Sequence, residues 1–192
     1  MSISLRIQDQ FIASIQTLQE GLSCLEEPIE QAVETLTACL MSEGKILVCG
    51  QGASGLAASH MAAILAHRFE RDRLGLAALA LSRDGAAMMD DTDPVGGFAR
   101  QVAALGQPGD VLVVVSMFGE PDGVKAAVRV AQERELRVVA LCGGEGGSLA
   151  ECLTDQDVLI CVPVLSAPRV VEAQFVVIHC LCDGIDYFLL GA

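Results

Sequence analysis

The chain has 192 residues, a hydrophobic fraction of 52% and a net charge of −13, with no tryptophan and one tyrosine. This length suits one domain over residues 1–192 with a full hydrophobic core, and the negative charge argues against nucleic acid as a direct partner. We find no apolar run typical of a membrane span and no signal-peptide pattern, so we expect a cytoplasmic protein without a membrane partner.

Residues 2–40 are predicted to form two helices, because apolar residues recur at helical spacing in two successive stretches. Pro28 suits the first turn of the second helix. We therefore expect an N-terminal helical hairpin over residues 1–43, ahead of an α/β core over residues 44–192. The hairpin either packs on the sheet or builds an oligomer, and its surplus of apolar residues favours the oligomer.

A glycine-rich turn follows the first predicted strand, Lys45 to Cys49, and leads into a helix over residues 56–70. Such a turn presents free backbone N–H groups at the helix start, where they favour an anion, usually a phosphate. The plain alternative is a tight turn without a ligand, since the spacing matches neither a dinucleotide fingerprint nor a Walker A loop. The candidate ligand-binding residues of this turn are Gly50, Gln51, Gly52, Ala53 and Ser54.

The rest of the chain alternates strands and helices, which predicts a parallel five-stranded sheet with helices on both faces. Ligands of such sheets bind at the carboxyl ends of the strands, so two further loops contribute Asp84, Ser116 and Gly119 as candidates. The remaining expected strands are 76–81, 111–115, 137–142 and 158–162, and the expected helices are 98–105, 122–135, 148–153 and 169–190.

The chain has eight cysteines, most of them within apolar runs. Without a secretory signal, this placement predicts buried free thiols rather than disulfides. Cys180 and Cys182 are two residues apart, so they do not form the Cys-x-x-Cys pair of a zinc or redox site.

Four segments together carry a resemblance to a known family. They are Lys-Ile-Leu-Val-Cys-Gly-Gln-Gly-Ala-Ser at 45–54, Ala-Leu-Gly-Gln-Pro-Gly-Asp-Val-Leu at 104–112, Val-Val-Ala-Leu-Cys-Gly at 138–143, and Glu-Ala-Gln-Phe-Val-Val-Ile-His-Cys-Leu-Cys-Asp-Gly-Ile-Asp at 172–186. This combination resembles the sugar isomerase (SIS) domain family, in particular the phosphoheptose isomerases and the DnaA initiator-associating protein. The resemblance covers nearly the whole chain. It implies a flavodoxin-like sheet, a homotetramer, and sites at subunit interfaces that bind sedoheptulose 7-phosphate.

The phosphate loop departs from the family pattern, Ser-Thr-Ser-Gly-Asn-Ser. This chain has Ser-Met-Phe-Gly-Glu-Pro at 116–121, so only Ser116 and Gly119 are kept. Pro121 lacks a backbone N–H, and Glu120 would repel a phosphate dianion. The sequence therefore predicts weakened phosphate binding at this loop.

The family's metal ligands are only half kept. His60 and His179 match the two histidines, whereas Ile64 and Val171 stand where the family has glutamate and glutamine. Isoleucine and valine donate no electron pair, which argues against a tetrahedral zinc site. We therefore expect no cofactor.

Aldose–ketose isomerisation moves a proton between adjacent carbons and needs a base, which Ile64 cannot be. The candidate catalytic residues that remain are Glu172, His179 and His60, and Arg169 is a candidate anion contact. Three of them also have a plain structural alternative: an interface histidine for His60, a core histidine for His179 and a surface charge for Arg169.

Three hypotheses follow. In the first, the chain is a SIS protein that has lost isomerase chemistry and works by binding or regulation. In the second, it is an active sedoheptulose 7-phosphate isomerase with a relocated base, such as Glu172 or an aspartate of 84–93. In the third, it is a module that still binds a sugar phosphate but does not catalyse the reaction. The joint loss of base, metal ligands and phosphate loop favours the first. The partners that the resemblance implies are further copies of the chain in a homotetramer, a sugar phosphate, and a protein such as a replication initiator.

Overall fold

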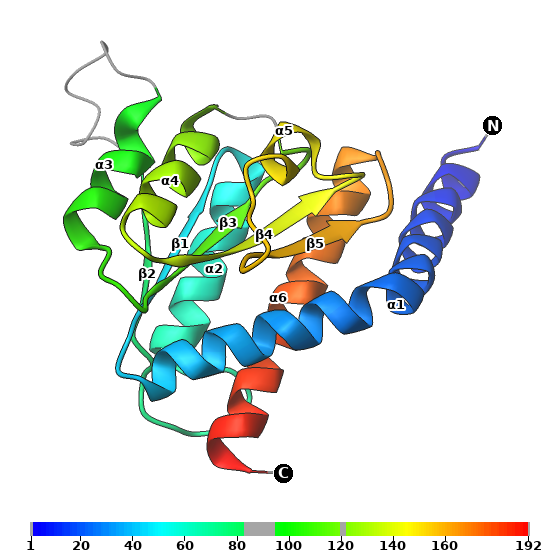
Figure 1. The fold of residues 1–192 in the computed structure, drawn as a ribbon. Coiled ribbons are helices and arrows are strands. Elements are labelled where there is room, and N and C mark those ends of the chain that lie inside the picture. Colours follow the sequence, from blue (N-terminus) through cyan, green and yellow to red (C-terminus); the bar gives the residue numbers. More distant parts are fainter. Residues whose placement is uncertain (1, 83–94, 120–121, 192) are drawn as a thin grey trace.

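A parallel sheet of five strands, in the order β2-β1-β3-β4-β5, forms the centre of the molecule (Figure 1). The computed structural model describes residues 2–82, 95–119 and 122–191. The parallel α/β sheet predicted from the alternation of elements is confirmed, and so is the flavodoxin-like arrangement that the family resemblance implies. The helices and strands are α1 (Ile3–Met41), β1 (Ile46–Gly50), α2 (Ala53–Ala66), β2 (Ala78–Ala80), α3 (Gly96–Leu105), β3 (Val111–Val115), α4 (Asp122–Glu133), β4 (Arg137–Gly143), α5 (Gly147–Ala150), β5 (Val158–Val162) and α6 (Ala167–Leu190).

The central strands are buried on both faces, as helices on both sides of a parallel sheet require. Successive β1 residues point to opposite faces. Ile46 and Val48 pack in a cluster with residues of α1, α2 and α6, whereas Leu47 and Cys49 pack in a second cluster with residues of α3 and α4. All strands run the same way, so their carboxyl ends meet along one edge of the sheet.

The predicted N-terminal helical hairpin is wrong: residues 3–41 form one helix, α1, with Pro28 inside it. A proline in a helix removes one hydrogen bond and bends the axis but does not reverse the chain. The residues just before Pro28 contain no turn sequence that would support a hairpin. The first half of α1 instead extends away from the body of the molecule, while the second half packs beside α6 and the sheet (Figure 1).

Helix α2 begins earlier than predicted, at Ala53, directly after Gly52. The residues expected to form a loop before the helix are therefore its first turn, which brings Ser54 into a helical N-terminus. Residues 83–94 lie outside the described part of the chain, and with them the candidate Asp84 and the aspartates proposed as alternative bases.

Helix α6 is long and apolar enough to cross a membrane, which the sequence reading did not find. It lies against α1, α2 and β4, and its buried stripe includes Ile178, Leu181 and Ile185. The same helix carries Arg169, and its Asp186 forms a buried ion pair. This buried stripe is typical of a core helix, whereas Val176, Tyr187, Phe188 and Leu190 of the same helix are exposed.

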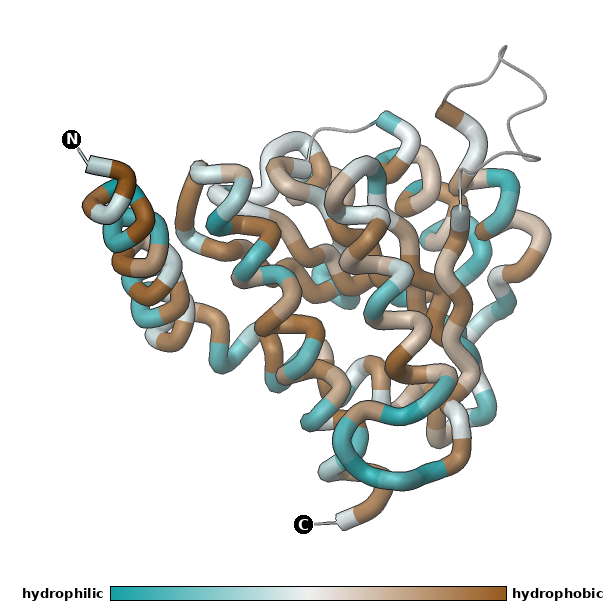
Figure 2. Tube along the Cα trace, turned by 180° about the vertical axis from the view of Figure 1, so that it is seen from behind, coloured by the Kyte–Doolittle hydropathy of each residue, from teal (hydrophilic) through white to brown (hydrophobic). Residues whose placement is uncertain are grey.

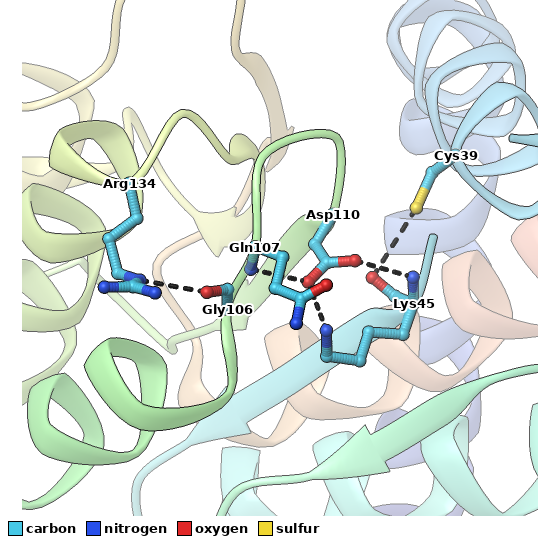
Figure 3. A network of polar contacts seen from close by, with 6 residues as sticks. All are labelled: Cys39, Lys45, Gly106, Gln107, Asp110 and Arg134. Carbon is cyan, nitrogen blue, oxygen red and sulfur yellow. Dashed lines mark hydrogen bonds and ion pairs between the residues drawn. The ribbon is translucent and has the colours of Figure 1, made fainter. Parts of the chain in front are cut away.

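The Gly-Gln-Pro-Gly-Asp turn has a structural role at the edge of the sheet where the strands begin (Figure 3). Asp110 is 3% exposed. Its carboxylate accepts hydrogen bonds from the backbone N–H groups of Lys45 and Gln107, both at 2.8 Å, and from Lys45 Nζ at 2.5 Å. One carboxylate thereby ties the starts of β1 and β3 together, on the side opposite the strand ends where ligands bind.

Candidate functional site

The first loop at the carboxyl edge of the sheet allows no side chain at its entry. A Cβ on Gly50 would lie 2.4 Å from the backbone oxygen of Ser54 and 2.9 Å from that of Val115. Gly52 has φ +63°, which favours glycine. The turn therefore brings the end of β1 directly onto the start of α2.

The N-terminus of α2 retains free polar groups. Its N-cap, Gly52, provides no side-chain hydrogen bond. The Gly55 N–H donates to the Gly52 carbonyl at 3.0 Å, whereas the N–H groups of Ala53 and Ser54 before it keep their capacity to donate. The Ser54 hydroxyl is buried and has no partner within the described residues. Gln51 is exposed beside it. This arrangement suits an oxygen-rich ligand such as a phosphate or a sugar hydroxyl.

The second loop, after β3, is closed on itself. The Gly119 N–H donates to Ser116 Oγ at 2.9 Å, and the Gly119 carbonyl accepts from the Leu149 N–H at 3.0 Å. Met117 and Phe118 are half-buried, and residues 120–121 lie outside the described range. The two family residues kept in this loop, Ser116 and Gly119, are thus bonded to the protein itself.

Gln174 joins α6 to the loop after β3 and to β4, and it was missed by sequence reasoning. It is fully buried, and its Nε2 donates to the carbonyl oxygens of Ser116 at 2.8 Å and Leu141 at 3.3 Å. Its Oε1 has no partner among the described residues. The sequence feature that indicates this role is a glutamine inside an otherwise apolar helical stripe, because a buried side-chain amide needs hydrogen-bond partners.

His60 of α2 and His179 of α6 meet, with their Nε2 atoms 2.9 Å apart. One imidazole donates to the other, so at least one ring is neutral in this arrangement. Burial, followed by the charge of His179, lowers the pKa of His60 below its ordinary value. Phe175 packs against His60 and Phe69 against His179, with ring centroids 5.3 and 5.4 Å apart. Both histidines are half-buried, and the structure brings together the two residues that match the histidines of the family's metal site.

The donors around this pair do not fit the zinc site that the family pattern implies. The described residues contain no group of three or more His, Cys, Asp or Glu side chains that could hold a metal ion. Ile64 lies one helical turn after His60, and each histidine's Nε2 is directed at the other. Two nitrogens are half of the four ligands that tetrahedral zinc takes.

Glu172, the proposed relocated base, is directed away from the histidine pair. It forms an ion pair with Arg169, one turn toward the start of α6. His179 lies two turns in the other direction, and helical side chains lean toward the N-terminus of their helix. The structure therefore brings His60 to His179 but does not bring Glu172 to either.

Arg169 links α6 to the first half of α1. Its side chain is 10% exposed, and its Nη1 donates to the backbone oxygen of Gln10 at 2.8 Å and to the Gln10 side chain at 3.2 Å. The candidate anion contact is thus engaged with the protein, although its Nε has no partner within the described residues.

Comparison with known proteins gives one consistent result. The SIS domain family matches residues 10–143. A phosphoheptose isomerase of Azoarcus sp. is 48% identical over 97% of this chain and 96% of its own, and one of Laribacter hongkongensis is 43% identical over 100% and 99%. The structure of a phosphoheptose isomerase from Neisseria gonorrhoeae superimposes with a TM-score of 0.89 at 40% identity, covering 96% of this chain and 99% of that one. One from Francisella tularensis gives 0.91 at 37% identity, covering 97% and 99%.

Proposed function

Because the chain belongs to the SIS domain family and is related to the phosphoheptose isomerases, we propose that it is a soluble sugar-phosphate-binding protein with impaired isomerase chemistry that acts by binding. The observation that carries this proposal is the environment of the His60–His179 pair. Ile64 offers no base there, and Glu172 is paired with Arg169 instead. Binding is supported by the N-terminus of α2, where the Ser54 hydroxyl and backbone N–H groups can take oxygen atoms of a ligand.

The relatives' names favour a second candidate function, an active sedoheptulose 7-phosphate isomerase. Its chemistry would need a proton acceptor other than residue 64. A neutral imidazole of the His60–His179 pair is one such acceptor, since the lowered pKa of His60 keeps a lone pair available near neutral pH. Glu172 is another, if it leaves Arg169.

We expect sedoheptulose 7-phosphate to raise the melting temperature by several degrees at about 100 times its Kd, without measurable turnover in a coupled assay. Losing a positioned base lowers a rate by about 10²–10⁴-fold, and misplacement of the sugar by about 1 Å can cost a further 10²-fold. If turnover is observed, the variants Glu172→Gln and His179→Gln test which side chain acts as the base. Sustained turnover that either variant abolishes would identify a relocated base and defeat the binding proposal.

We also propose that the chain assembles as a homotetramer through α1 and α6. The first half of α1 exposes eight apolar side chains, and in Figure 2 hydrophobic residues run along this projecting segment. A groove of about 580 Å³ between α1 and α6, with mainly apolar walls, lies next to it. An exposed apolar surface of this extent lowers the solubility of a single chain, so it is typical of an interaction surface. The eight residues are Ile3, Leu5, Ile7, Phe11, Ile12, Ile15, Leu18 and Leu22.

Light scattering at micromolar concentration should give four times the chain mass of 20.1 kDa. Phe11→Asp with Ile15→Asp should reduce it to that of one chain, because two charges would enter the apolar contact. Gln16→Asp, at an exposed position about 140° around the same helix from Phe11, should leave it unchanged. A wild-type protein that scatters as a monomer would contradict the proposal.

The same preparations allow a pull-down with a replication initiator, the protein partner that the family resemblance suggests.

A further inference from the structure

Two cysteines face each other across the last two strands of the sheet. Cys142 of β4 and Cys161 of β5 are partners in the parallel register, and both pack in the cluster beneath α4 and α5. Neighbouring strands lie about 4.8 Å apart, which is inside the Cα–Cα range of disulfides, about 4.4–6.8 Å. All eight cysteines are free thiols in this structure, so the pair is present in its reduced form.

The two thiols differ in access. Cys142 is fully buried, whereas Cys161 lies on the edge strand and is half-buried. Its sulfur lies against Gly146, where an added Cβ would be 3.3 Å from it. A small oxidant can therefore reach Cys161 first, leaving Cys142 as the internal thiol that resolves the product.

The electrostatics agree with close approach of the two sulfurs. Burial and then the charge of Cys161 raise the pKa of Cys142 to about 12, and burial and then Glu145 raise the pKa of Cys161. Thiolate is therefore scarce at neutral pH, and the reaction is slow.

We propose that Cys142 and Cys161 form a redox-active dithiol that closes to a disulfide on exposure to hydrogen peroxide. The Cys161 thiolate attacks one peroxide oxygen, an S–O bond forms as the O–O bond breaks, and Cys161 becomes a sulfenic acid. The hydroxide released takes up the proton that Cys161 had lost and leaves as water. The Cys142 sulfur then attacks the sulfenic sulfur, the S–S bond forms as the S–O bond breaks, and the hydroxyl leaves with the Cys142 proton as a second water. Two thiols are oxidised by two electrons, and one peroxide is reduced to two waters.

This bond would act close to the candidate site. Gly143, the residue after Cys142, donates its N–H to the Met117 carbonyl at 2.8 Å, and Leu149 donates to the Gly119 carbonyl at 3.0 Å. The segment between the two strands thereby holds the loop after β3. Side chains of directly opposed residues stand parallel, so closing the bond strains the sheet, and such disulfides are the readily reduced ones.

The test uses the full chain treated with millimolar hydrogen peroxide and digested without reduction. Cleavage after Glu145 and Glu151 separates Cys142 from Cys161, and further cleavage after Asp155 and Asp157 separates Cys161 from Cys152. We expect a linked Cys142–Cys161 peptide pair, two hydrogens lighter than the sum of its parts, which dithiothreitol separates. The pair should form equally in Cys152→Ala and be absent from Cys142→Ala. Cys152 is the matched control, because it packs in the same cluster but has no register partner and donates to the Ser148 carbonyl at 3.3 Å.

Three outcomes would overturn the proposal: Cys161 linked to Cys152, Cys161 linked to a second chain, or Cys161 oxidised to sulfinic acid with Cys142 still free. Peptide mapping of the wild-type chain alone distinguishes these outcomes, so the test holds even if Cys142→Ala folds poorly.

Discussion

Replacing Arg73 with methionine should lower the free energy of unfolding by about 3–5 kcal/mol, because it leaves a buried charge without its partner. Arg73 Nε lies 2.5 Å from Asp186 Oδ1, and the two side chains are 3% and 4% exposed. The same guanidinium donates to the carbonyl oxygens of Leu65 at 2.9 Å and Ile64 at 3.2 Å, near the end of α2. The substitution removes the ion pair and also the two hydrogen bonds that Arg73 donates to carbonyl oxygens near the end of α2.

Urea unfolding followed by circular dichroism measures this effect, with Arg68→Met as the matched control. Arg68 is 52% exposed, and its ion pair with Asp72, 95% exposed, is 4.0 Å long, so its loss should change stability by less than about 1 kcal/mol. Adding Asp186→Leu to Arg73→Met should recover part of the loss, since no unpaired charge then remains. Equal midpoints for the Arg73 and Arg68 variants would contradict the assignment.

Ile64→Glu should raise the rate of proton transfer by about 10²–10⁴-fold, the contribution of a positioned general base. Residue 64 lies one helical turn after His60 on α2 and is only partly buried, so a carboxylate there can reach the surface of the histidine pair. Incorporation of solvent deuterium into sedoheptulose 7-phosphate, followed by NMR, detects this step without requiring complete turnover.

Ile64→Gln is the matched control, because it has the same shape as the glutamate without a base and should show no gain. Equal rates in the two variants would mean that residue 64 does not reach the reacting carbon.

Purified protein also tests whether the chain binds zinc. We expect no stoichiometric zinc in the wild-type chain and retained zinc after Ile64→Glu with Val171→Gln, which restores four donors. One zinc per wild-type chain after dialysis would overturn the expectation that the protein has no metal.

The sequence was sufficient for the α/β architecture, because the signals of that architecture are local. The run Val111–Val115 is short, rich in β-branched valine and preceded by a turn sequence, which together favour a strand buried on both faces, and a glycine turn between strand and helix is recognisable without its surroundings. The loss of the family base is also a sequence-level fact, since it depends on the identity of residue 64 alone.

Tertiary structure decided the N-terminal segment and the roles of the polar residues. Pro28 permits either a helix boundary or a bend, and the helix continues because its second half buries Ala32, Val33 and Leu36 against the sheet and α6. Asp110 belongs to a recognisable motif, yet its role at the start of the strands depends on Lys45, 65 residues away.

The candidate site depended on contacts between distant parts of the chain. His60 and His179 are 119 residues apart in the sequence and 2.9 Å apart in space. Gln174 lies in a helix whose periodicity indicates only that its face is buried, and its partners are backbone oxygens of β4 and of the loop after β3. Hydropathy and spacing indicate which face of a helix or strand is apolar, because side chains repeat with the local period. Whether that face is buried depends on packing, since the apolar residues in the first half of α1 are exposed. Which buried or half-buried polar groups pair with one another is a matter of directional hydrogen bonds between elements, and those exist only once the elements have packed.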